Sequence, residues 1–269
     1  MAREDRPLIE ALGIGERELV ALVGGGGKTS LLFALADELA AAGRGVVLTT
    51  TTRIATAEVQ RVPTVYLTHH LPGQRSTRLK TPCLVIGATG PEKAKSVPLE
   101  LPRRLLARPE VDAVLVEADG AKMLPVKAPA THEPAVPPGT TLFVVLMGID
   151  ALDGPLHTVA HRPHLVGALT GRAQSERLRP ADAATLLTHP RGGLKRAPPG
   201  ARVVIFINKV ETAAQMEKAI QIADQIAVHP RIERVVLGAL QTGRPVRTVF
   251  AKAGIETPSH HRPAGAENE

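Results

Sequence analysis

The stretch that decides the fold is LVGGGGKTS, residues 22–30. It lies between an apolar, strand-like segment and a long segment with the apolar periodicity of a helix. We interpret it as a phosphate-binding loop, because consecutive glycines let backbone N–H groups turn towards a polyphosphate and the following helix adds the positive end of its dipole. Lys28 would reach the β- and γ-phosphates, and the Thr29 hydroxyl would bind Mg²⁺. The residues expected to contact a nucleotide here are Gly24, Gly25, Gly26, Gly27, Lys28, Thr29 and Ser30.

This stretch, the phosphate loop, departs at one position from the full pattern G-x-x-x-x-G-K-[ST]. Leu22 stands where that pattern has its first glycine. The alternative is a glycine-rich turn with a chance lysine, but the strand-like segment before it and the helix-like segment after it favour phosphate binding.

The composition indicates a globular protein with one main domain. Its 269 residues are 43% hydrophobic and 22% charged. We expect a single domain over residues 1–256, with a helical insertion at about 149–200, and a disordered polar tail at 257–269. Because no apolar run reaches the length of a membrane span and the first residues lack the apolar core of a signal peptide, we expect a cytoplasmic protein without a membrane partner. The single cysteine, Cys83, allows no internal disulfide.

The charge balance is basic without indicating a nucleic-acid partner. The chain has 33 Lys and Arg against 26 Asp and Glu, a formal net charge of +7. These basic residues are scattered, and 2% aromatic residues leave little for bases to stack on. We therefore expect the basic surface to serve anionic nucleotides or an acidic protein partner.

Apolar runs alternate with helical patterns along the chain, which predicts a three-layer α/β fold with a mostly parallel sheet. The runs are near-continuous, as in strands that helices cover on both faces. The predicted strands are 18–23, 45–50, 83–88, 112–118, 141–148, 202–208 and 234–240, and the predicted helices are 29–42, 99–108, 163–170, 180–188 and 212–227. The segment 119–139 carries five prolines, which predicts a long irregular loop of functional importance.

Carboxylates follow the apolar run 113–116. Glu117 ends this run, and Asp119 comes two residues later. A carboxylate at the carboxyl end of a buried strand beside the phosphate-loop strand is placed to hold Mg²⁺. We choose Glu117 for that role, with Asp119 as the alternative or as a group that orients the nucleophile. The alternative to a functional role is that either carboxylate only caps a strand or a loop.

Two further strand ends carry polar residues. One is the run TTTTR, residues 49–53. The hydroxyls of Thr51 and Thr52 are candidates for binding Mg²⁺ or the γ-phosphate, and Arg53 is a candidate for stabilising the charge of the phosphoryl group. Threonine is also a common strand residue, which is the alternative explanation.

The other lies at the end of strand 202–208, where Asn208, Lys209 and Glu211 resemble the Asn-Lys-x-Asp sequence with which GTP-binding proteins hold guanine, with glutamate in place of aspartate. A strand followed by a polar helix start is the alternative there.

Several segments together resemble one known family. The series VGGGGKTSLLFALA, TTTTRIA, VLVEADGAKMLPVKAPATHEPAVP, AHRP and RVVIFINKVE is similar to the YqeC-type selenium-dependent hydroxylase accessory proteins, over roughly residues 10–245. The resemblance implies a P-loop NTPase that serves the maturation of selenium-dependent molybdenum hydroxylases. The glutamate of VLVE also resembles that of dethiobiotin synthetase and of the molybdopterin-guanine-dinucleotide accessory GTPases.

Two functional hypotheses follow, and both use Mg²⁺ with ATP or GTP. In one, the protein is a small-molecule kinase or a nucleotidyl or phosphoryl transferase acting on a cofactor precursor. In the other, which we favour, it is a nucleotide-dependent maturation factor that hydrolyses the triphosphate and acts on a molybdenum hydroxylase or its cofactor precursor. No metal other than Mg²⁺ is expected. The candidate residues for a second substrate are Lys122, Lys127, His132, Glu133, His161 and Arg162.

Overall fold

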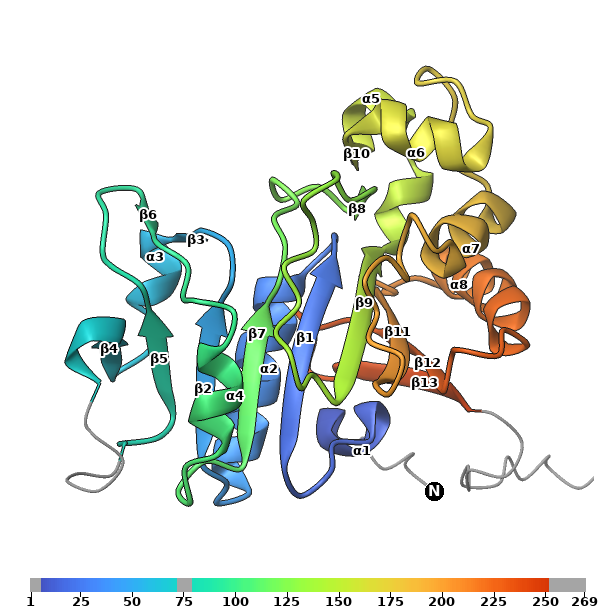
Figure 1. Ribbon diagram of the computed structural model, residues 1–269. Helices are drawn as coiled ribbons and strands as arrows, with labels where there is room; N and C mark the ends of the chain where they lie inside the picture. Colours follow the sequence, from blue (N-terminus) through green and yellow to red (C-terminus); the bar gives the residue numbers. More distant parts are fainter. Residues whose placement is uncertain (1–5, 72–78, 252–269) are drawn as a thin grey trace, which may run out of the picture.

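The computed structural model describes residues 6–71 and 79–251. The predicted tail at 257–269 and the last residues of the predicted domain lie outside this part of the chain. A nine-stranded sheet runs through the centre, in the order β13-β12-β11-β9-β1-β7-β2-β5-β4 (Figure 1). All neighbouring strands are parallel except β12 and β13, which are antiparallel.

The strands of this sheet are β1 (Glu18–Gly24), β2 (Val46–Thr50), β4 (Val65–Leu67), β5 (Cys83–Ile86), β7 (Ala113–Glu117), β9 (Leu142–Gly148), β11 (Arg202–Asn208), β12 (Arg234–Gly238) and β13 (Val246–Ala251). Two small pairs lie outside it, β3 (Ile54–Ala55) with β6 (Lys93–Ala94) and β8 (Val126–Lys127) with β10 (Ala160–His161). The helices are α1 (Leu8–Leu12), α2 (Lys28–Ala41), α3 (Thr56–Val59), α4 (Leu101–Leu106), α5 (Leu156–Val159), α6 (Pro163–Thr170), α7 (Pro180–Thr188) and α8 (Ala213–Ala227), with 3-10 turns at Thr68–His70 and Ile149–Leu152.

Helices cover both faces of the sheet, so the three-layer α/β fold predicted from the sequence is confirmed. Along β1, Val20 and Leu22 pack into the apolar cluster that contains α1 and α2. Ala21 and Val23 point to the opposite face, into the cluster that contains α7 and α8. Because side chains alternate along a strand, one apolar run fills both layers.

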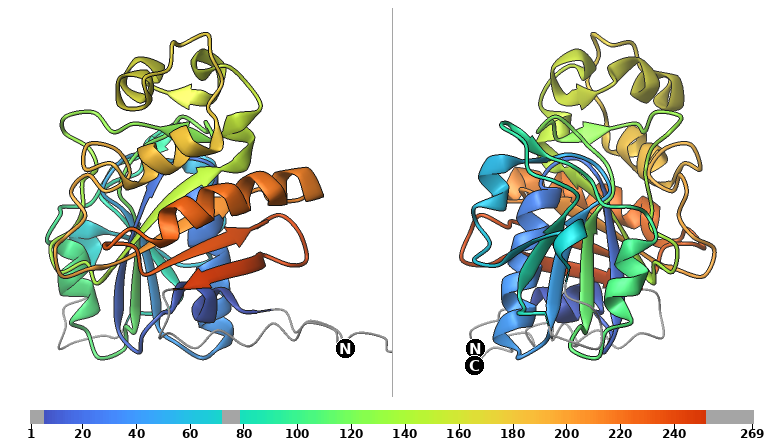
Figure 2. Two further views of the ribbon diagram at one scale, coloured as in Figure 1. Left: turned by 90° about the vertical axis from the view of Figure 1, so that its right-hand side faces the viewer. Right: turned by 60° about the vertical axis from the view of Figure 1, so that its left-hand side comes forward.

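The predicted helical insertion between β9 and β11 is present. It contains α5, α6 and α7: α5 and α6 rise above the carboxyl ends of the strands, and α7 lies beside α8 on one face of the sheet (Figures 1 and 2). The helices α6 and α7 have the predicted bounds, and each begins with a proline, whose fixed φ suits the first turn of a helix. Among the described helices, none has the length and apolar character needed to cross a bilayer.

The structure differs from the prediction at several places, and the strand β4 and the short elements α1, α3, α5, β3 and β6 were not predicted. β13 was not predicted, because the adjacent polar residues Arg247 and Thr248 interrupt the short apolar sequence VRTVFA, which lies at the sheet edge. The segment 119–139, predicted without regular structure, contains the two-residue strand β8, which pairs with β10 of the insertion. The helix predicted at 99–108 is shorter, since α4 spans six residues.

The register of the central strands places the phosphate loop and the strand-end carboxylate together. Leu22 of β1 lies opposite Glu117 of β7, and Thr50 of β2 lies opposite the same glutamate. Since the parallel strands end at one edge, the polar residues that follow β1, β2 and β7 share that edge.

Phe206 of β11 provides a test of the packing. Its side chain is fully buried, and Gly238 of β12 has no room for a Cβ because the Phe206 ring lies against it. We expect Phe206→Ala to lower the free energy of unfolding by about 3–5 kcal/mol, measured by urea denaturation. Val228→Ala, at a position 83% exposed, is the matched control and should change it by less than about 0.5 kcal/mol. Similar losses in both variants would contradict the packing.

Candidate functional site

The turn between β1 and α2 has a backbone shape that requires glycine. Gly24, Gly26 and Gly27 have φ angles of +100°, +74° and +126°. A Cβ atom on Gly26 would lie 2.0 Å from the backbone nitrogen of Gly148. Other residues rarely adopt such φ angles, so these glycines allow the turn to approach the end of β9 closely. α2 begins at Lys28, directly after the turn.

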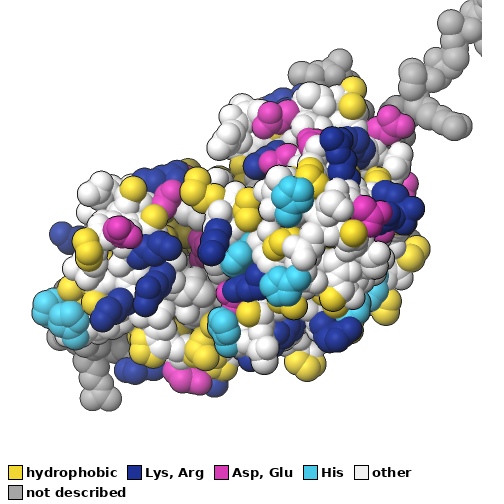
Figure 3. Space-filling model, turned by 90° about the horizontal axis from the view of Figure 1, so that it is seen from above, with side chains coloured by type: hydrophobic (Ala, Val, Ile, Leu, Met, Phe, Trp, Pro, Cys, Tyr) yellow, Lys and Arg dark blue, Asp and Glu magenta, His cyan; other side chains and the backbone are white. Residues whose placement is uncertain are grey.

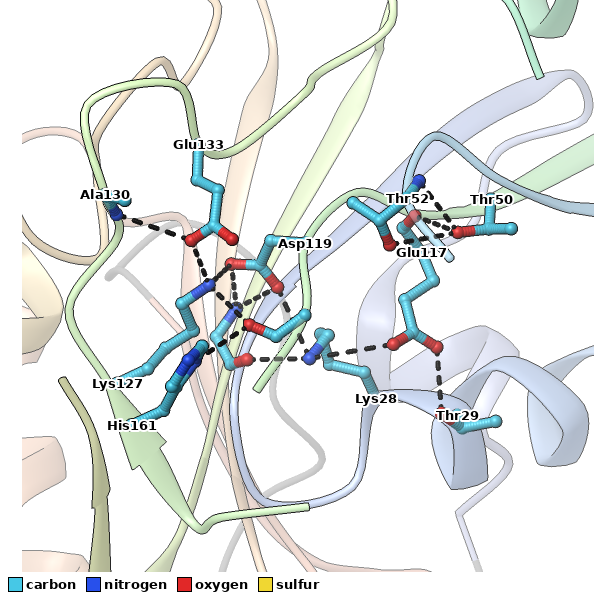
Figure 4. A network of polar contacts seen from close by, with 12 residues as sticks. Lys28, Thr29, Thr50, Thr52, Glu117, Asp119, Lys127, Ala130, Glu133 and His161 are labelled. Atoms are coloured by element: carbon cyan, nitrogen blue, oxygen red, sulfur yellow. Dashed lines mark hydrogen bonds and ion pairs between the residues drawn. The ribbon is translucent and has the colours of Figure 1, made fainter. Parts of the chain in front are cut away.

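The ammonium group of Lys28 lies between the turn and two carboxylates. Nζ donates to the carbonyl oxygen of Gly24 at 2.7 Å. It lies 3.3 Å from Oδ1 of Asp119 and 3.8 Å from Oε1 of Glu117, and the side chain is 4% exposed. A buried cation must be paired, and this pairing holds Lys28 over the glycine turn (Figure 4).

Thr29 and Glu117 form the part of the site that suits a magnesium ion. The Thr29 hydroxyl donates to Oε2 of Glu117 at 2.8 Å. Burial raises the pKa of Glu117, while Lys28 and the Thr29 hydrogen bond act in the opposite direction. Both groups offer oxygen ligands, and Mg²⁺ binds one or two protein groups while keeping waters or phosphate oxygens. The donor set therefore fits Mg²⁺.

Asp119 has a different environment from Glu117. Its carboxylate accepts the N–H of Gly24 at 3.1 and 3.2 Å. It lies 3.0 Å from Nζ of Lys127 on one side and 3.3 Å from Lys28 on the other, and its side chain is 2% exposed. This carboxylate is fully used in holding two cations and the glycine turn, which makes Glu117 the better candidate for the metal and Asp119 a positioning group.

A series of ion pairs continues from Asp119 through Lys127 to Glu133 (Figure 4) and reaches the insertion at Arg162. Lys127 Nζ lies 2.7 Å from Oε2 of Glu133, and Arg162 donates to both oxygens of Glu133 at 2.8 and 3.1 Å. We call this series the ionic chain; its members are Lys28, Asp119, Lys127, Glu133 and Arg162. It joins the phosphate loop, the segment 119–139 and the insertion through charged contacts.

The charges of the ionic chain shift the pKa of Glu133, which belongs to it, and of His161, which lies beside it. Burial alone would raise the pKa of Glu133, but the hydrogen bonds and charges of Lys127 and Arg162 lower it to about 2. The pKa of His161 is lowered by burial and by the same two cations. Nδ1 of His161 lies 3.2 Å from the carbonyl oxygen of Gly120. His161 is thus held against the segment 119–139.

Four of the six candidate residues for a second substrate lie together, namely Lys127, Glu133, His161 and Arg162. Lys122 and His132 are exposed on the segment 119–139. Since Lys127 and Arg162 are paired with carboxylates, the cluster connects two segments of the fold in this conformation and offers little unpaired charge to an anion.

The threonines after β2 are engaged mainly with the protein. Thr51 Oγ1 donates to the carbonyl oxygen of Ala135 at 2.6 Å. Thr52 donates its N–H to Oγ1 of Thr50 at 3.1 Å. Arg53 is exposed. These residues lie at the same sheet edge as Glu117, as their positions after β2 predict, and their roles in binding phosphate stay predictions.

Asn208 lies against the phosphate loop. Its Nδ2 donates to the carbonyl oxygen of Gly26 at 2.8 Å, and its Oδ1 accepts the N–H of Leu240 at 3.2 Å. The side-chain amide thus links the glycine turn to the end of β12. In this conformation Asn208 positions the loop.

Lys209 and Glu211 follow at the surface. Lys209 Nζ lies 2.6 Å from Oδ2 of Asp150. Glu211 is exposed, and its N–H donates to Gln215 at 2.9 Å, just before α8. The structure thus places the three residues of the predicted guanine site one after another at the end of β11, and binding of a base by them stays a prediction.

Sequence reasoning missed several residues that shape the site. Thr50 Oγ1 donates to the carbonyl oxygen of Glu117 at 3.0 Å. Lys195 Nζ donates to Ala130 O at 2.5 Å, and Arg196 donates to His132 O at 2.8 Å. The basic run PRGGLKR at 190–196 was the available signal, but nothing in it indicates that its cations bind backbone carbonyls of the segment 119–139.

The surface above the sheet is hollowed between the insertion and the part of the molecule that carries β3 and β6. Lys and Arg side chains gather on both sides of this hollow, and histidines lie on the insertion side (Figure 3). Beneath the ionic chain, a cavity of about 20 Å³ is lined by Gly24, Asp119, Lys127 and apolar residues of β9 and α7. This volume holds about one water molecule. In the described ranges, no three His, Cys, Asp or Glu side chains gather as a further metal site.

The fold and the site together define a class: a three-layer, mostly parallel α/β protein of the P-loop type, in which a glycine turn, Lys28 and Thr29 face a strand-end glutamate. Residues 20–164 match the model of the family described as YqeC protein. The chain is also 34% identical over 241 residues to uncharacterized protein YqeC of Escherichia coli (strain K12), a match that covers 87% of this chain and 92% of the relative. The chain belongs to the YqeC family.

Glu133 gives the site a dependence on pH that can be measured. Its pKa in the folded protein, about 2, is below the usual value of 4.5. The ionised group therefore stabilises the fold above about pH 4.5, and this contribution, up to about 3 kcal/mol, is lost as the pH falls towards 2. Glu133→Gln should lower stability at pH 7, and its difference from the unmodified protein should shrink to about 1 kcal/mol or less at pH 2.5, measured by urea denaturation.

The exposed variant Glu211→Gln is the control and should follow the unmodified protein at each pH. A difference between Glu133→Gln and the unmodified protein that stays constant from pH 7 to 2.5 would contradict the pairing of Glu133 with Lys127 and Arg162.

Proposed function

We propose that the protein binds a nucleoside triphosphate with Mg²⁺ at the phosphate loop and hydrolyses it, and that it serves as a maturation factor for selenium-dependent molybdenum hydroxylases. The observation that carries the nucleotide site is the 2.8 Å contact between the Thr29 hydroxyl and Glu117, with Lys28 3.8 Å from the same carboxylate. A phosphate-loop cation, a hydroxyl and a strand-end carboxylate are the parts that a magnesium triphosphate requires.

Each residue then has a stated role. Lys28 leaves the Gly24 carbonyl and binds the terminal phosphates, where its charge offsets theirs. Thr29 and Glu117 hold Mg²⁺, directly or through water, and the ion, when bound, would neutralise charge that develops on the phosphates. Asp119 keeps the glycine turn in place through the Gly24 N–H. Arg53, exposed after β2, is the candidate cation for the transferred phosphoryl group.

Membership of the YqeC family supports the maturation role, which the sequence resemblance implies. The partner would be a molybdenum hydroxylase or its cofactor precursor, and the hollowed surface beside the insertion is the candidate place for it (Figure 3). Lys122 and His132 are exposed on the segment 119–139. The cell compartment we propose is the cytoplasm.

A second candidate function is a kinase or a nucleotidyl or phosphoryl transferase for a cofactor precursor. The position of His161 favours it, because the insertion brings this side chain to 3.2 Å from Gly120 O, next to Asp119 of the nucleotide site. Product analysis separates the two. A phosphorylated or nucleotidylated small molecule indicates a transferase, and phosphate release that a hydroxylase stimulates indicates a maturation factor.

Titration calorimetry with Mg²⁺ and either ATP or GTP tests the nucleotide site. We expect Lys28→Ala to weaken binding by at least about tenfold, or roughly 1.4 kcal/mol, because the phosphates lose their main cation. Lys218→Ala, on the exposed face of α8, is the control and should bind as the unmodified protein does. Equal affinity in a folded Lys28→Ala variant would contradict the phosphate loop.

The same titrations test whether the site prefers guanine to adenine nucleotides. A preference for GTP that Glu211→Ala removes would support Asn208, Lys209 and Glu211 as the base site, because an unpaired carboxylate against adenine is unfavourable. Equal affinity for ATP and GTP would leave a nucleotide site without guanine recognition.

Glu117→Gln tests the metal site. The amide keeps the shape of the strand end but lacks the charge that holds Mg²⁺, so we expect nucleotide to bind while the hydrolysis rate falls by at least about tenfold. Phosphate release at saturating nucleotide measures the rate. Asp119→Asn is the comparison, since it removes the partner of Lys28 and Lys127. Loss of hydrolysis in Asp119→Asn together with full activity in Glu117→Gln would show that Asp119 is the metal carboxylate.

A further inference from the structure

A short turn of the segment 119–139 contacts the phosphate loop at a group that a nucleotide would use. The carbonyl oxygen of Leu124 accepts the N–H of Gly26 at 3.0 Å. Gly26 is one of the glycines whose N–H groups would face a polyphosphate in the proposed function, on which this inference rests. A phosphate oxygen and the Leu124 carbonyl would compete for that one hydrogen.

The other contacts of Gly25 and Gly26 come from fixed parts of the sheet, while the buried Asp119 holds Gly24. Gly25 donates its N–H to Leu146 O of β9 at 3.0 Å. The carbonyl oxygen of Gly26 accepts from Asn208 at the end of β11. Both strands are inner strands of the nine-stranded sheet, hydrogen-bonded on each side. Leu124 belongs to the irregular segment 119–139 and, unlike Asp119 of the same segment, makes its contact through a backbone carbonyl without an ion pair to hold it. It is therefore the partner of Gly26 that is free to leave.

Residues 121–124 form a strained turn, which we call the strap. The N–H of Leu124 donates to Ala121 O at 3.0 Å, and the central residues Lys122 and Met123 have φ angles of +50° and +62°. Turns with positive φ at both central positions favour Asn-Gly and similar pairs, because a Cβ is crowded there. The Met123 side chain is 99% exposed, so no packing around it offsets the strain.

The chain is anchored on both sides of the strap. The carbonyl oxygen of Gly120 accepts from Lys127 at 2.7 Å and lies 3.2 Å from Nδ1 of His161. The carbonyl oxygen of Pro125 accepts the N–H of Gly148 at 2.9 Å. Only the strap has to move for the Gly26 N–H to become free, and its first anchor is in contact with the insertion.

We propose that the strap is an autoinhibitory contact that competes with the triphosphate for the phosphate loop. In the structure it is closed on Gly26. A phosphate that takes the Gly26 N–H displaces Leu124, and Lys122 and Met123 return to negative φ. Because the strap continues directly from Gly120, which Lys127 and His161 hold, its position signals the state of the phosphate site to the insertion.

Two substitutions at Met123 should change affinity in opposite directions. Met123→Gly tolerates positive φ, stabilises the closed strap and should weaken the binding of magnesium triphosphate by roughly three- to tenfold. Met123→Pro has φ fixed near −65°, cannot close the strap and should tighten binding by a similar factor of roughly three- to tenfold. Met123→Ala keeps the strain and is the matched control, with unchanged affinity. The measurement is calorimetry with ATP and GTP and Mg²⁺.

Fluorescence follows the strap directly. The sequence has no tryptophan, so Met123→Trp introduces the only indole, at an exposed position. Its emission should change on addition of magnesium triphosphate, with half-saturation at the dissociation constant that calorimetry gives. In a double variant that also carries Lys28→Ala, the emission should stay constant on addition of the same ligand. Val228→Trp, 83% exposed after α8, is the control without a change.

The outcomes separate the strap from the proposed function. In one outcome, triphosphate binds to the unmodified protein, the three variants Met123→Gly, Met123→Pro and Met123→Ala have equal affinities for it, and the Met123→Trp emission is constant. The autoinhibitory role of the strap is then overturned, and the nucleotide site stands. If no triphosphate binds to any folded variant, including Met123→Pro, both are overturned.

Discussion

Lys28 and Lys127 are buried cations that share one carboxylate, Asp119, and the arrangement of the site depends on this pairing. A charge inside a protein is tolerated only when an opposite charge or hydrogen bonds compensate it. Lys28 cannot be placed over the glycine turn without Asp119, and Asp119 in turn accepts the Gly24 N–H. Through Lys127, the same requirement fixes Glu133 and then Arg162, so the segment 119–139 and the insertion take positions set by the phosphate loop.

The parallel sheet makes this pairing possible. Strands β1, β2 and β7 are neighbours and end at one edge, which brings the glycine turn, the threonines after Thr50 and Glu117 together from positions far apart in the sequence. The insertion lies above that edge (Figure 1). A nucleotide at the phosphate loop would therefore lie between rigid strands below and irregular segments above, and the irregular segments are the parts able to respond to it.

The sequence predicted the elements well where apolar runs are long and bounded by clear signals. β1, β11, α6 and α7 follow from continuous apolar runs or from a proline at the helix start. β13 was missed because two adjacent polar residues, Arg247 and Thr248, interrupt its short apolar run, which gives a weaker signal. The predicted neighbourhood of Lys28, Thr29 and Glu117 follows from parallel topology, since adjacent strand ends must meet.

The contacts within the site could not be predicted in the same way. Arg162 and Glu133 are 29 residues apart, and no local spacing rule connects them. The Leu124 contact to Gly26 joins two backbone groups, which side-chain patterns do not reveal. The sequence identified Asp119, Lys127 and Glu133 as candidates for chemistry, but their charges bind one another, and this balance appears only when the segment 119–139 is folded over the loop.

A crystal structure with Mg²⁺ and a non-hydrolysable triphosphate would show directly whether the glycine turn, Lys28, Thr29 and Glu117 form a nucleotide site. We expect the terminal phosphates on the glycine turn and Lys28, the metal beside Thr29 and Glu117, and the Leu124 carbonyl away from the Gly26 N–H. A triphosphate bound elsewhere, with Lys28 still on Gly24 and Asp119, would contradict this nucleotide site.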